Sequence, residues 1–212
     1  MKTYNVNAPT PQGPAKRDQQ AFLIGVDFHE AALRATHEVN DPKGGTISPT
    51  CPMVVCYAFA AELYLKSLLT KTVRNHRLNV LYEHLSDEKR HDVAAAYEVR
   101  TGRNLSVLRN DLRTLGVAFV DWRYVFEGEG QQLHCNLLVA FTKSVYETIR
   151  RHKPDWKVRE VLNERFRAEE ETPVMTIKNL GGGTFIKIVD GTGQAKFDRA
   201  GPQAQATEPN TR

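Results

Sequence analysis

A cationic residue lies among aromatic side chains in the segment 119–127, Phe-Val-Asp-Trp-Arg-Tyr-Val-Phe-Glu. Arg123 falls one position beyond an apolar helical stripe, and Glu127 follows it by one helical turn. One interpretation is an Arg–Glu ion pair at the edge of the core, with Arg123 stacked on an aromatic ring or paired with Glu62. The other is a guanidinium held for phosphate or RNA. The residue types alone favour the ion pair.

A second polar cluster begins with Asn75-His76-Arg77-Leu78. His76 can cap a helix, act as an acid–base group or face the solvent, and a histidine near a helix start is most often structural or solvent-facing. Upstream, Glu62 and Lys66 are four residues apart on an apolar segment, in the order that favours an ion pair. These residues are the candidate polar groups of the chain, and they lack the spacing of a metal site.

Other common sites are absent from the sequence. Gly181-Gly182-Gly183 does not precede a helix, so it predicts a turn and not a phosphate-binding loop. There is no nucleophile elbow and no His-Glu-x-x-His motif. The three cysteines form no C-x-x-C pair, and Cys51, Cys56, His134 and Cys135 lack the paired spacing of structural zinc ligands. We therefore expect no metal and no cofactor, with the thiols reduced and buried or partly buried.

Seven segments are expected to form the helices that position these groups. The predicted helices span about 15–39, 53–72, 78–85, 86–101 and 105–126, followed by a long one over 131–151 and a further short one over 156–167. The segment 53–72 is apolar around most of its circumference, which predicts a central helix. Ser86 with Asp87 and Glu88 predicts a helix start. Gly116 permits close packing or a kink within 105–126.

The pattern changes after Pro173 to an alternation typical of strands, with the glycine turn between two of them. We predict a flexible leader over 1–14, a helical bundle over 15–168, a β-hairpin over 172–197 and a disordered tail over 198–212. The fold class is therefore mainly α, with a short β-hairpin near its C-terminal end.

The 212 residues carry a net charge of +4 and a pI of about 9.0, which permits nucleic-acid binding without requiring it. Two basic clusters, at 71–77 and 150–153, are more typical of helix ends than of RNA-binding surfaces. No long uninterrupted apolar run and no apolar leader occur, so we expect neither membrane association nor export, and a cytoplasmic location.

The polar clusters also carry a resemblance to a known family. The segments Ala61-Glu62-Leu-Tyr-Leu65-Lys66-Ser-Leu68-Leu69 and His76-Arg-Leu78-Asn-Val-Leu81 resemble the E-x-x-L-K-x-L-L helix and the G-H-D-L-x-x-L segment of bacterial HEPN-like proteins. The segment 119–127 is similar to their F-x-x-W-R-Y-x-Y-E segment. The resemblance covers about residues 20–152.

The resemblance implies a HEPN-like helical bundle, a homodimer, and a family associated with RNA cleavage, toxin–antitoxin pairs, phage defence, or RNA and nucleotide binding. The ribonuclease members carry R-x(4–6)-H, whereas Gly128, Glu129 and Gly130 occupy the positions counted from Arg123, and the next histidine is His134. Asn75 and Arg77 also replace the glycine and aspartate of G-H-D-L. A metal-free ribonuclease needs an acid–base group near the scissile phosphate.

The leading hypothesis is therefore a non-catalytic HEPN-like domain that binds RNA, a nucleotide or a protein partner. Its central polar site would be formed by Arg123, Tyr124 and Glu127, with Glu62, Lys66 and His76 nearby. One alternative is a divergent ribonuclease that uses Arg123 with His76 or His134. Another is a scaffolding protein whose C-terminal hairpin adds a strand to the sheet of a partner.

Overall fold

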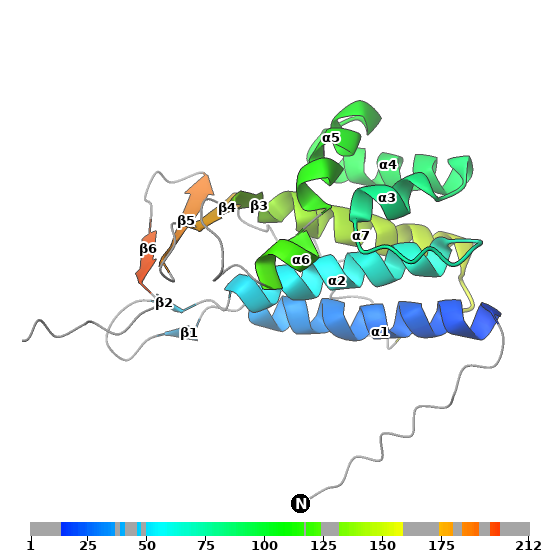
Figure 1. Ribbon diagram of the computed structural model, residues 1–212, viewed down its shortest axis with the longest axis horizontal. Coiled ribbons are helices and arrows are strands. Elements are labelled where there is room, and N and C mark those ends of the chain that lie inside the picture. The colour runs from blue at the N-terminus through cyan, green and yellow to red at the C-terminus, as the bar shows by residue number, and fades with distance from the viewer. Residues whose placement is uncertain are drawn as a thin grey trace, which may run out of the picture.

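The chain folds into a helical bundle joined to a small antiparallel sheet (Figure 1). The computed structural model describes residues 14–36, 39–40, 46–47, 50–116, 118–123, 132–158, 174–179, 184–190 and 196–199. Within these ranges, side chains are described for residues 17–36, 51–116, 118–119, 121–122 and 133–158. Most of the predicted leader, the glycine turn and residues 200–212 lie outside these ranges.

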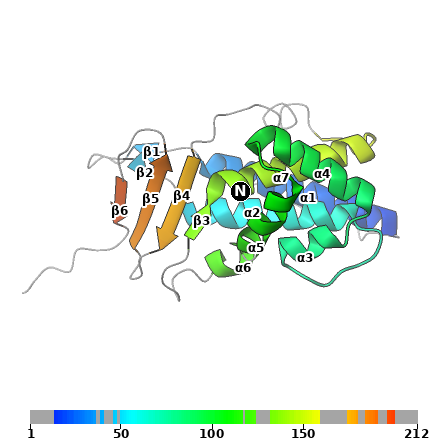
Figure 2. The ribbon, with the colours of Figure 1, turned by 90° about the horizontal axis from the view of Figure 1, so that it is seen from above.

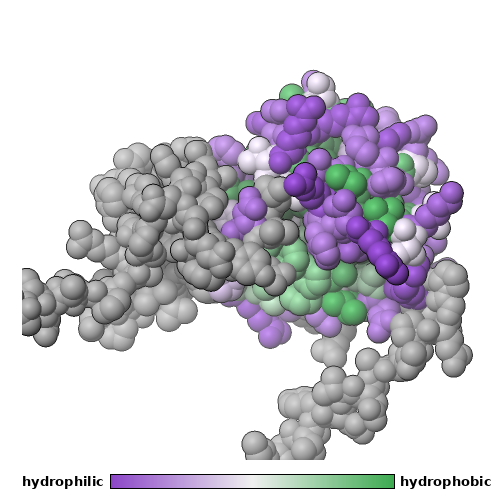
Figure 3. Space-filling model, in the orientation of Figure 1, coloured by the Kyte–Doolittle hydropathy of each residue, from purple (hydrophilic) through white to green (hydrophobic). Residues whose placement is uncertain are grey.

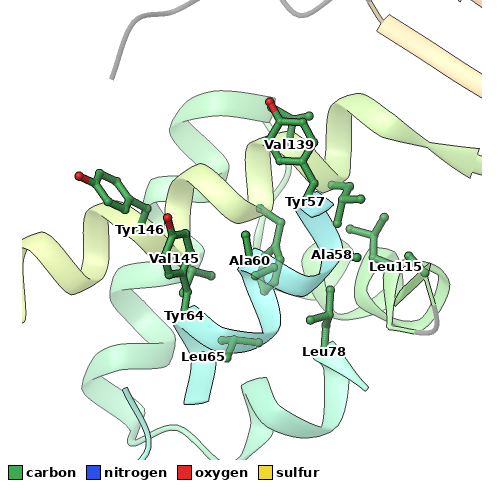
Figure 4. Packing of buried hydrophobic residues seen from close by; sticks show 14 of the residues in the cluster. Tyr57, Ala58, Ala60, Tyr64, Leu65, Leu78, Leu115, Val139, Val145 and Tyr146 are labelled. Atoms are coloured by element: carbon green, nitrogen blue, oxygen red, sulfur yellow. The ribbon is translucent and has the colours of Figure 1, made fainter. Parts of the chain in front are cut away.

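Three long helices form the centre of the bundle. Helix α1 (Pro14–Ala35) runs along α2 (Thr50–Leu68), and α2 also packs against α7 (Cys135–His152). Buried side chains join α2 to α7: the rings of Tyr64 from α2 and Tyr146 from α7 have centroids 5.6 Å apart (Figure 4), and the Thr142 hydroxyl of α7 lies 3.3 Å from the Tyr57 carbonyl of α2. The prediction that the most apolar helix is central is confirmed.

Helix α1 approaches α2 closely at Gly25. A Cβ atom at this position would lie 2.8 Å from two ring atoms of Tyr64, which is closer than packed atoms allow. The absence of a side chain therefore lets the fully buried Tyr64 ring lie against the backbone of α1. This contact fixes the spacing between the helices that border the candidate site.

By length and composition, the stretch Cys51–Leu68 of α2 could cross a membrane. However, 61% of it is buried inside the bundle, and it carries the charged residues Glu62 and Lys66. These properties are typical of the core helix of a soluble protein, where neighbouring helices cover the apolar surface.

Three shorter helices cover one side of this centre. The predicted short helix is α3 (Leu78–Glu83), and the predicted start at Ser86 opens α4 (Asp87–Thr101), which ends at Gly102 in the left-handed conformation (φ 68°). In α5 (Leu105–Leu115), the Asn104 side chain caps the first turn by accepting from the Val107 N–H.

The prediction of one continuous helix over 105–126 is wrong, because the helix ends with α5 and a second helix, α6 (Ala118–Arg123), follows. The Gly116 carbonyl accepts the backbone N–H of Leu78 (3.3 Å), which is the first residue of α3. A Cβ at Gly116 would lie 2.6 Å from the Asn79 side-chain oxygen. The break therefore results from close packing against α3, which an apolar periodicity does not record. Phe126 lies outside the described residues.

The predicted helix over 131–151 begins later, because residues 132–134 form strand β3 (Gln132–His134) and the helix starts at Cys135. Strand β3 pairs antiparallel with β4 (Val174–Asn179), so that Leu133 lies opposite Ile177. Residues 156–158 are not helical, and the rest of the short helix predicted over 156–167 lies outside the described residues.

The two strands predicted after Pro173 belong to a four-stranded sheet in the order β3-β4-β5-β6 (Figure 2). Strand β4 pairs antiparallel with β5 (Thr184–Asp190), and β5 pairs with β6 (Lys196–Arg199). Strand β6 extends past residue 198, where the predicted tail begins. A second, two-stranded pairing joins β1 (Val39–Asn40) to β2 (Thr46–Ile47), so Val39 lies in a strand and not in the helix predicted over 15–39.

Candidate functional site

The buried carboxylate of Glu62 lies at the centre of the candidate site. Its side chain is 1% exposed, and its Oε1 atom accepts hydrogen bonds from Lys66 Nζ (2.7 Å) and His76 Nδ1 (2.9 Å). The Glu62–Lys66 ion pair predicted from the four-residue spacing is confirmed. The second carboxylate oxygen, Oε2, is buried and has no hydrogen-bond partner among the described residues. Burying a carboxylate is unfavourable unless donors compensate it, and Lys66 and His76 both donate to Oε1.

The connector 69–77 brings His76 to Glu62. It leaves the end of α2 and doubles back along that helix before entering α3 (Figure 1). Because the carboxylate of Glu62 can only accept, His76 donates from Nδ1, and its Nε2 atom lies on the other side of the ring. The His76 side chain is 62% exposed, so the edge and outer face of the imidazole are accessible.

The inner face of His76 rests on a column of aromatic rings. His76 stacks on Phe119 of α6, with ring centroids 6.2 Å apart and planes inclined by 27°. Phe119 in turn stacks on Phe59 of α2 at 4.7 Å and 15°, and Phe28 of α1 meets Phe59 edge-on at 4.6 Å. We call Phe28, Phe59, Phe119 and His76 the aromatic column. The outermost ring of the column is that of His76, which is exposed to solvent.

A pocket of about 480 Å³ lies beside this column. It is bordered by the first turns of α1, the end of α2 and the connector 69–77. The lining residues are Arg17, Asp18, Ala21, Lys66, Leu69, Lys71, Thr72, Val73, Arg74 and His76. We call it the basic pocket, because four of these side chains are cationic and Asp18 is its one acidic lining residue. Hydrophilic side chains gather over the connector in Figure 3.

The cations of the basic pocket differ from most others in the described part of the chain. Arg17, Lys71 and Arg74 are exposed, and the described residues offer them no ion pair or hydrogen bond. Six other arginines of the described residues are paired with carboxylates: Arg34 with Glu30, Arg90 with Asp87 and Glu83, Arg100 with Glu147, Arg103 with Asp111, Arg109 with Glu83 and Arg151 with Asp92. Arg77 and Arg113 are also exposed and without such a pair, but they do not line the pocket. Unpaired cations around one hollow create a positive potential that attracts anions.

The predicted site residues are only partly placed. Glu62, Lys66 and His76 meet directly, and Arg123 ends α6, the helix whose Phe119 contacts His76. The Arg123 side chain and all of Tyr124 and Glu127 lie outside the described residues. The pairing of Arg123 with Glu62 or Glu127 therefore stays a prediction.

The two basic sequence clusters have different surroundings. At the end of α7, Arg150 donates to the Trp156 carbonyl, while His152 Nε2 lies 2.6 Å from Asp92, so this cluster joins α7 to α4 and to the following turn. Helix α2 ends at Leu68, before Lys71 and Arg74, so these two residues belong to the connector and line the basic pocket. Arg17 was not foreseen, because no local signal links it to residues about fifty positions later.

The remaining polar clusters have structural roles. Buried Asp111 accepts two hydrogen bonds from Arg103 (2.8 and 2.7 Å) and one from the Tyr97 hydroxyl (2.9 Å), which ties α4 to α5. Burial, followed by the bond to Asp111, raises the pKa of Tyr97. Burial also raises the pKa of the free thiols Cys51 and Cys56. Within the described ranges, no three His, Cys, Asp or Glu side chains form a group suited to a metal.

These features give a site with a fixed histidine, a buried carboxylate and a cationic pocket, which is chemistry suited to an anionic ligand. The chain matches no protein-family model, no curated protein and no solved structure.

Proposed function

We propose that this chain is a HEPN-like domain that, without catalysing a reaction, holds RNA or a nucleotide by a phosphate group in the basic pocket. The observation that carries the proposal is that Arg17, Lys71 and Arg74 line one pocket with a single acidic lining residue, Asp18, and form no ion pair with the described residues. Phosphate oxygens supply the acceptors and the negative charge that these donors lack.

The HEPN-like assignment is supported by the way in which the resembling segments meet. Glu62 and Lys66 come from the first segment, His76 from the second and Phe119 from the third. The first two segments are close in sequence but the third begins about forty residues later, and their side chains are in direct contact around Glu62 and the aromatic column. A resemblance carried by unrelated surface residues would have no reason to converge in this way. The same resemblance implies a homodimer, which is part of the proposal.

Binding at exposed cations is expected to depend strongly on salt. Arg17, Lys71 and Arg74 face water, so each contributes a modest, screened attraction, and several must act together. Lys66 is already paired with Glu62 and contributes less net charge to the pocket. We therefore expect the affinity for single-stranded RNA and for pyrophosphate to fall as the salt concentration rises.

Replacing Arg74 by alanine tests this proposal. The loss of one exposed charge is expected to weaken binding of pyrophosphate and of a short single-stranded RNA by about three- to tenfold at low salt. Calorimetric titration measures both. The matched control is Arg113→Ala, because Arg113 is an exposed arginine on α5 that does not line the pocket. An equal loss in both variants, or no binding of either probe by the wild type, would reject the proposal.

A second candidate function is metal-independent RNA cleavage, favoured by the contact between Glu62 and His76. A buried carboxylate at Nδ1 fixes the ring and leaves Nε2 to accept a proton. Nε2 would take the proton of a 2′-hydroxyl while the O2′–P bond forms and the P–O5′ bond breaks. The leaving 5′ oxygen would take a proton from water, and the product would be a 2′,3′-cyclic phosphate. Lys66 would stabilise the charge on the phosphate oxygens.

The test for cleavage is to incubate the purified protein with tRNA in the presence of a metal chelator and to measure the rate at which the tRNA is cut. If the chain is an enzyme, His76→Gln and Glu62→Gln are each expected to lower the rate at least about 100-fold, because the first removes the acid–base group and the second removes the carboxylate that holds it in place. Arg123→Ala would report whether that side chain takes part. Circular dichroism establishes that the variants remain folded. Intact RNA at high protein concentration would eliminate this candidate and leave the binding function.

A further inference from the structure

We propose that the basic pocket takes an unpaired nucleotide whose base stacks on the outer face of His76. This inference rests on the proposed function and specifies its ligand class. The phosphate would be held by the cations of the basic pocket, and the base would extend the aromatic column by one more ring. The ligand is then a free nucleotide or a single-stranded RNA end, and not a duplex.

The aromatic column supports this inference because it is already a series of stacked rings with an accessible end. Phe59, Phe119 and His76 follow one another with inclinations of 15° and 27° between neighbouring planes. A flat base can continue such a series, since every base offers an aromatic face and single-stranded ligands are commonly held by stacking on rings. The inner face of His76 is covered by Phe119, so the 62% exposure of its side chain belongs to the outer face and the Nε2 edge.

Glu62 makes the His76 ring suitable as a platform. A surface histidine normally rotates among several rotamers, and stacking on it would cost conformational entropy. Here the hydrogen bond from Nδ1 to the buried Glu62 carboxylate and the contact with Phe119 hold the ring in place before a ligand arrives. Such preorganisation lowers the cost of binding. In this inference, the buried carboxylate serves to position the ring.

His76 both ends the column and lines the basic pocket, so a base and a phosphate can be held at adjacent places. The volume of about 480 Å³ lies within the range of small-molecule sites and suits a single nucleotide. The bases of a duplex are stacked on one another and cannot reach an additional ring. A phosphorylated peptide would satisfy the cations alone and gain nothing from the column.

The experiment compares phosphate, ribose 5-phosphate, AMP, UMP and adenosine by calorimetric titration at one low salt concentration. We expect AMP to bind about tenfold or more tightly than ribose 5-phosphate, with UMP in between, because base stacking adds to the phosphate contact. His76→Gln keeps a donor for Glu62 but removes the ring. It is expected to abolish the difference between AMP and ribose 5-phosphate and to leave ribose 5-phosphate binding nearly unchanged.

Two further variants separate stacking from other effects of His76. His76→Trp retains a ring and an N–H donor, so it is expected to keep the preference for AMP. His84→Gln, on the exposed end of α3, is the matched control and should change nothing. Equal affinity of the wild type for AMP and ribose 5-phosphate, or equal affinity for a phosphoserine peptide and AMP, would overturn this inference and leave the proposed function standing. Failure of every phosphate probe to bind would overturn both.

Discussion

Replacing Lys71 and Arg74 together by glutamate is expected to lower the affinity for pyrophosphate and single-stranded RNA by about 100-fold or more at low salt. A charge about 6 Å from a phosphate charge contributes roughly 0.7 kcal/mol in water, and reversing its sign doubles the change. Two reversals therefore amount to roughly 3 kcal/mol, which is about two powers of ten. Calorimetric titration of the double variant measures the loss.

The fold of this double variant should be preserved. Both residues are exposed and have no ion pair or hydrogen bond with the described residues, so the free energy of unfolding is expected to change by less than about 0.5 kcal/mol. The matched control is Arg113→Glu with Lys157→Glu, which makes the same change in net charge at exposed positions outside the pocket. If the control loses as much affinity as the pocket variant, net charge and not the basic pocket holds the ligand.

Acidification below pH 6.5 is expected to destabilise the bundle through His29. This residue of α1 is fully buried, its Nδ1 atom lies 3.2 Å from the Tyr64 hydroxyl, and the rings of Tyr57, Tyr64 and Tyr146 meet it edge-on. Burial, and next the charge of Lys143, lower the pKa of His29 from 6.5 to about 3. The folded protein therefore keeps this ring neutral over a range in which the unfolded chain protonates it.

The direction of the effect follows from proton binding. Between pH 6.5 and 3 the unfolded state binds a proton at His29 that the folded state does not, so stability is full above pH 6.5 and decreases as the pH falls. The loss is about 1.4 kcal/mol per pH unit at most, or roughly 2 to 3 kcal/mol between pH 6.5 and 4.5. That is a large share of the 5 to 15 kcal/mol typical of a domain.

Urea denaturation of wild type and His29→Gln at pH 6.5 and 4.5 isolates this contribution. Carboxylates titrate in both proteins, so the wild type should lose about 2 to 3 kcal/mol more than the variant over this interval. His84→Gln is the control, because His84 is exposed and its loss should leave the pH dependence of the wild type in place. Identical pH dependence in wild type and His29→Gln would show that burial of His29 does not govern acid stability.

The helices that the sequence predicted well are those with strong local signals. Apolar periodicity marked α2 as the central helix, and the four-residue spacing of Glu62 and Lys66 correctly gave their ion pair. The start predicted at Ser86 and the end predicted at residue 101 agree with the limits of α4. Each of these features depends on residues within one or two helical turns, where spacing alone decides which side chains are neighbours.

The candidate site was only partly predictable. Glu62, Lys66 and His76 were chosen from segments that resemble a family, but residue spacing could not place His76 at Glu62, fourteen positions away. Arg17 had no local signal, and the basic cluster at 71–77 looked like a helix end. Gly116 was predicted to permit close packing or a kink, but the end of α5 there depends on its packing against α3, and the later start of α7 depends on the pairing of β3 with a strand about forty residues later.

By itself, the sequence determined where most of the helices lie, which of their faces are apolar and which charges lie one turn apart. The tertiary structure decided that Arg17, Lys71 and Arg74 surround one pocket and that His76 ends the aromatic column above a buried carboxylate. The physical reason is that helical periodicity fixes neighbours along one element, whereas contacts between elements depend on how their apolar faces pack and on long-range strand register.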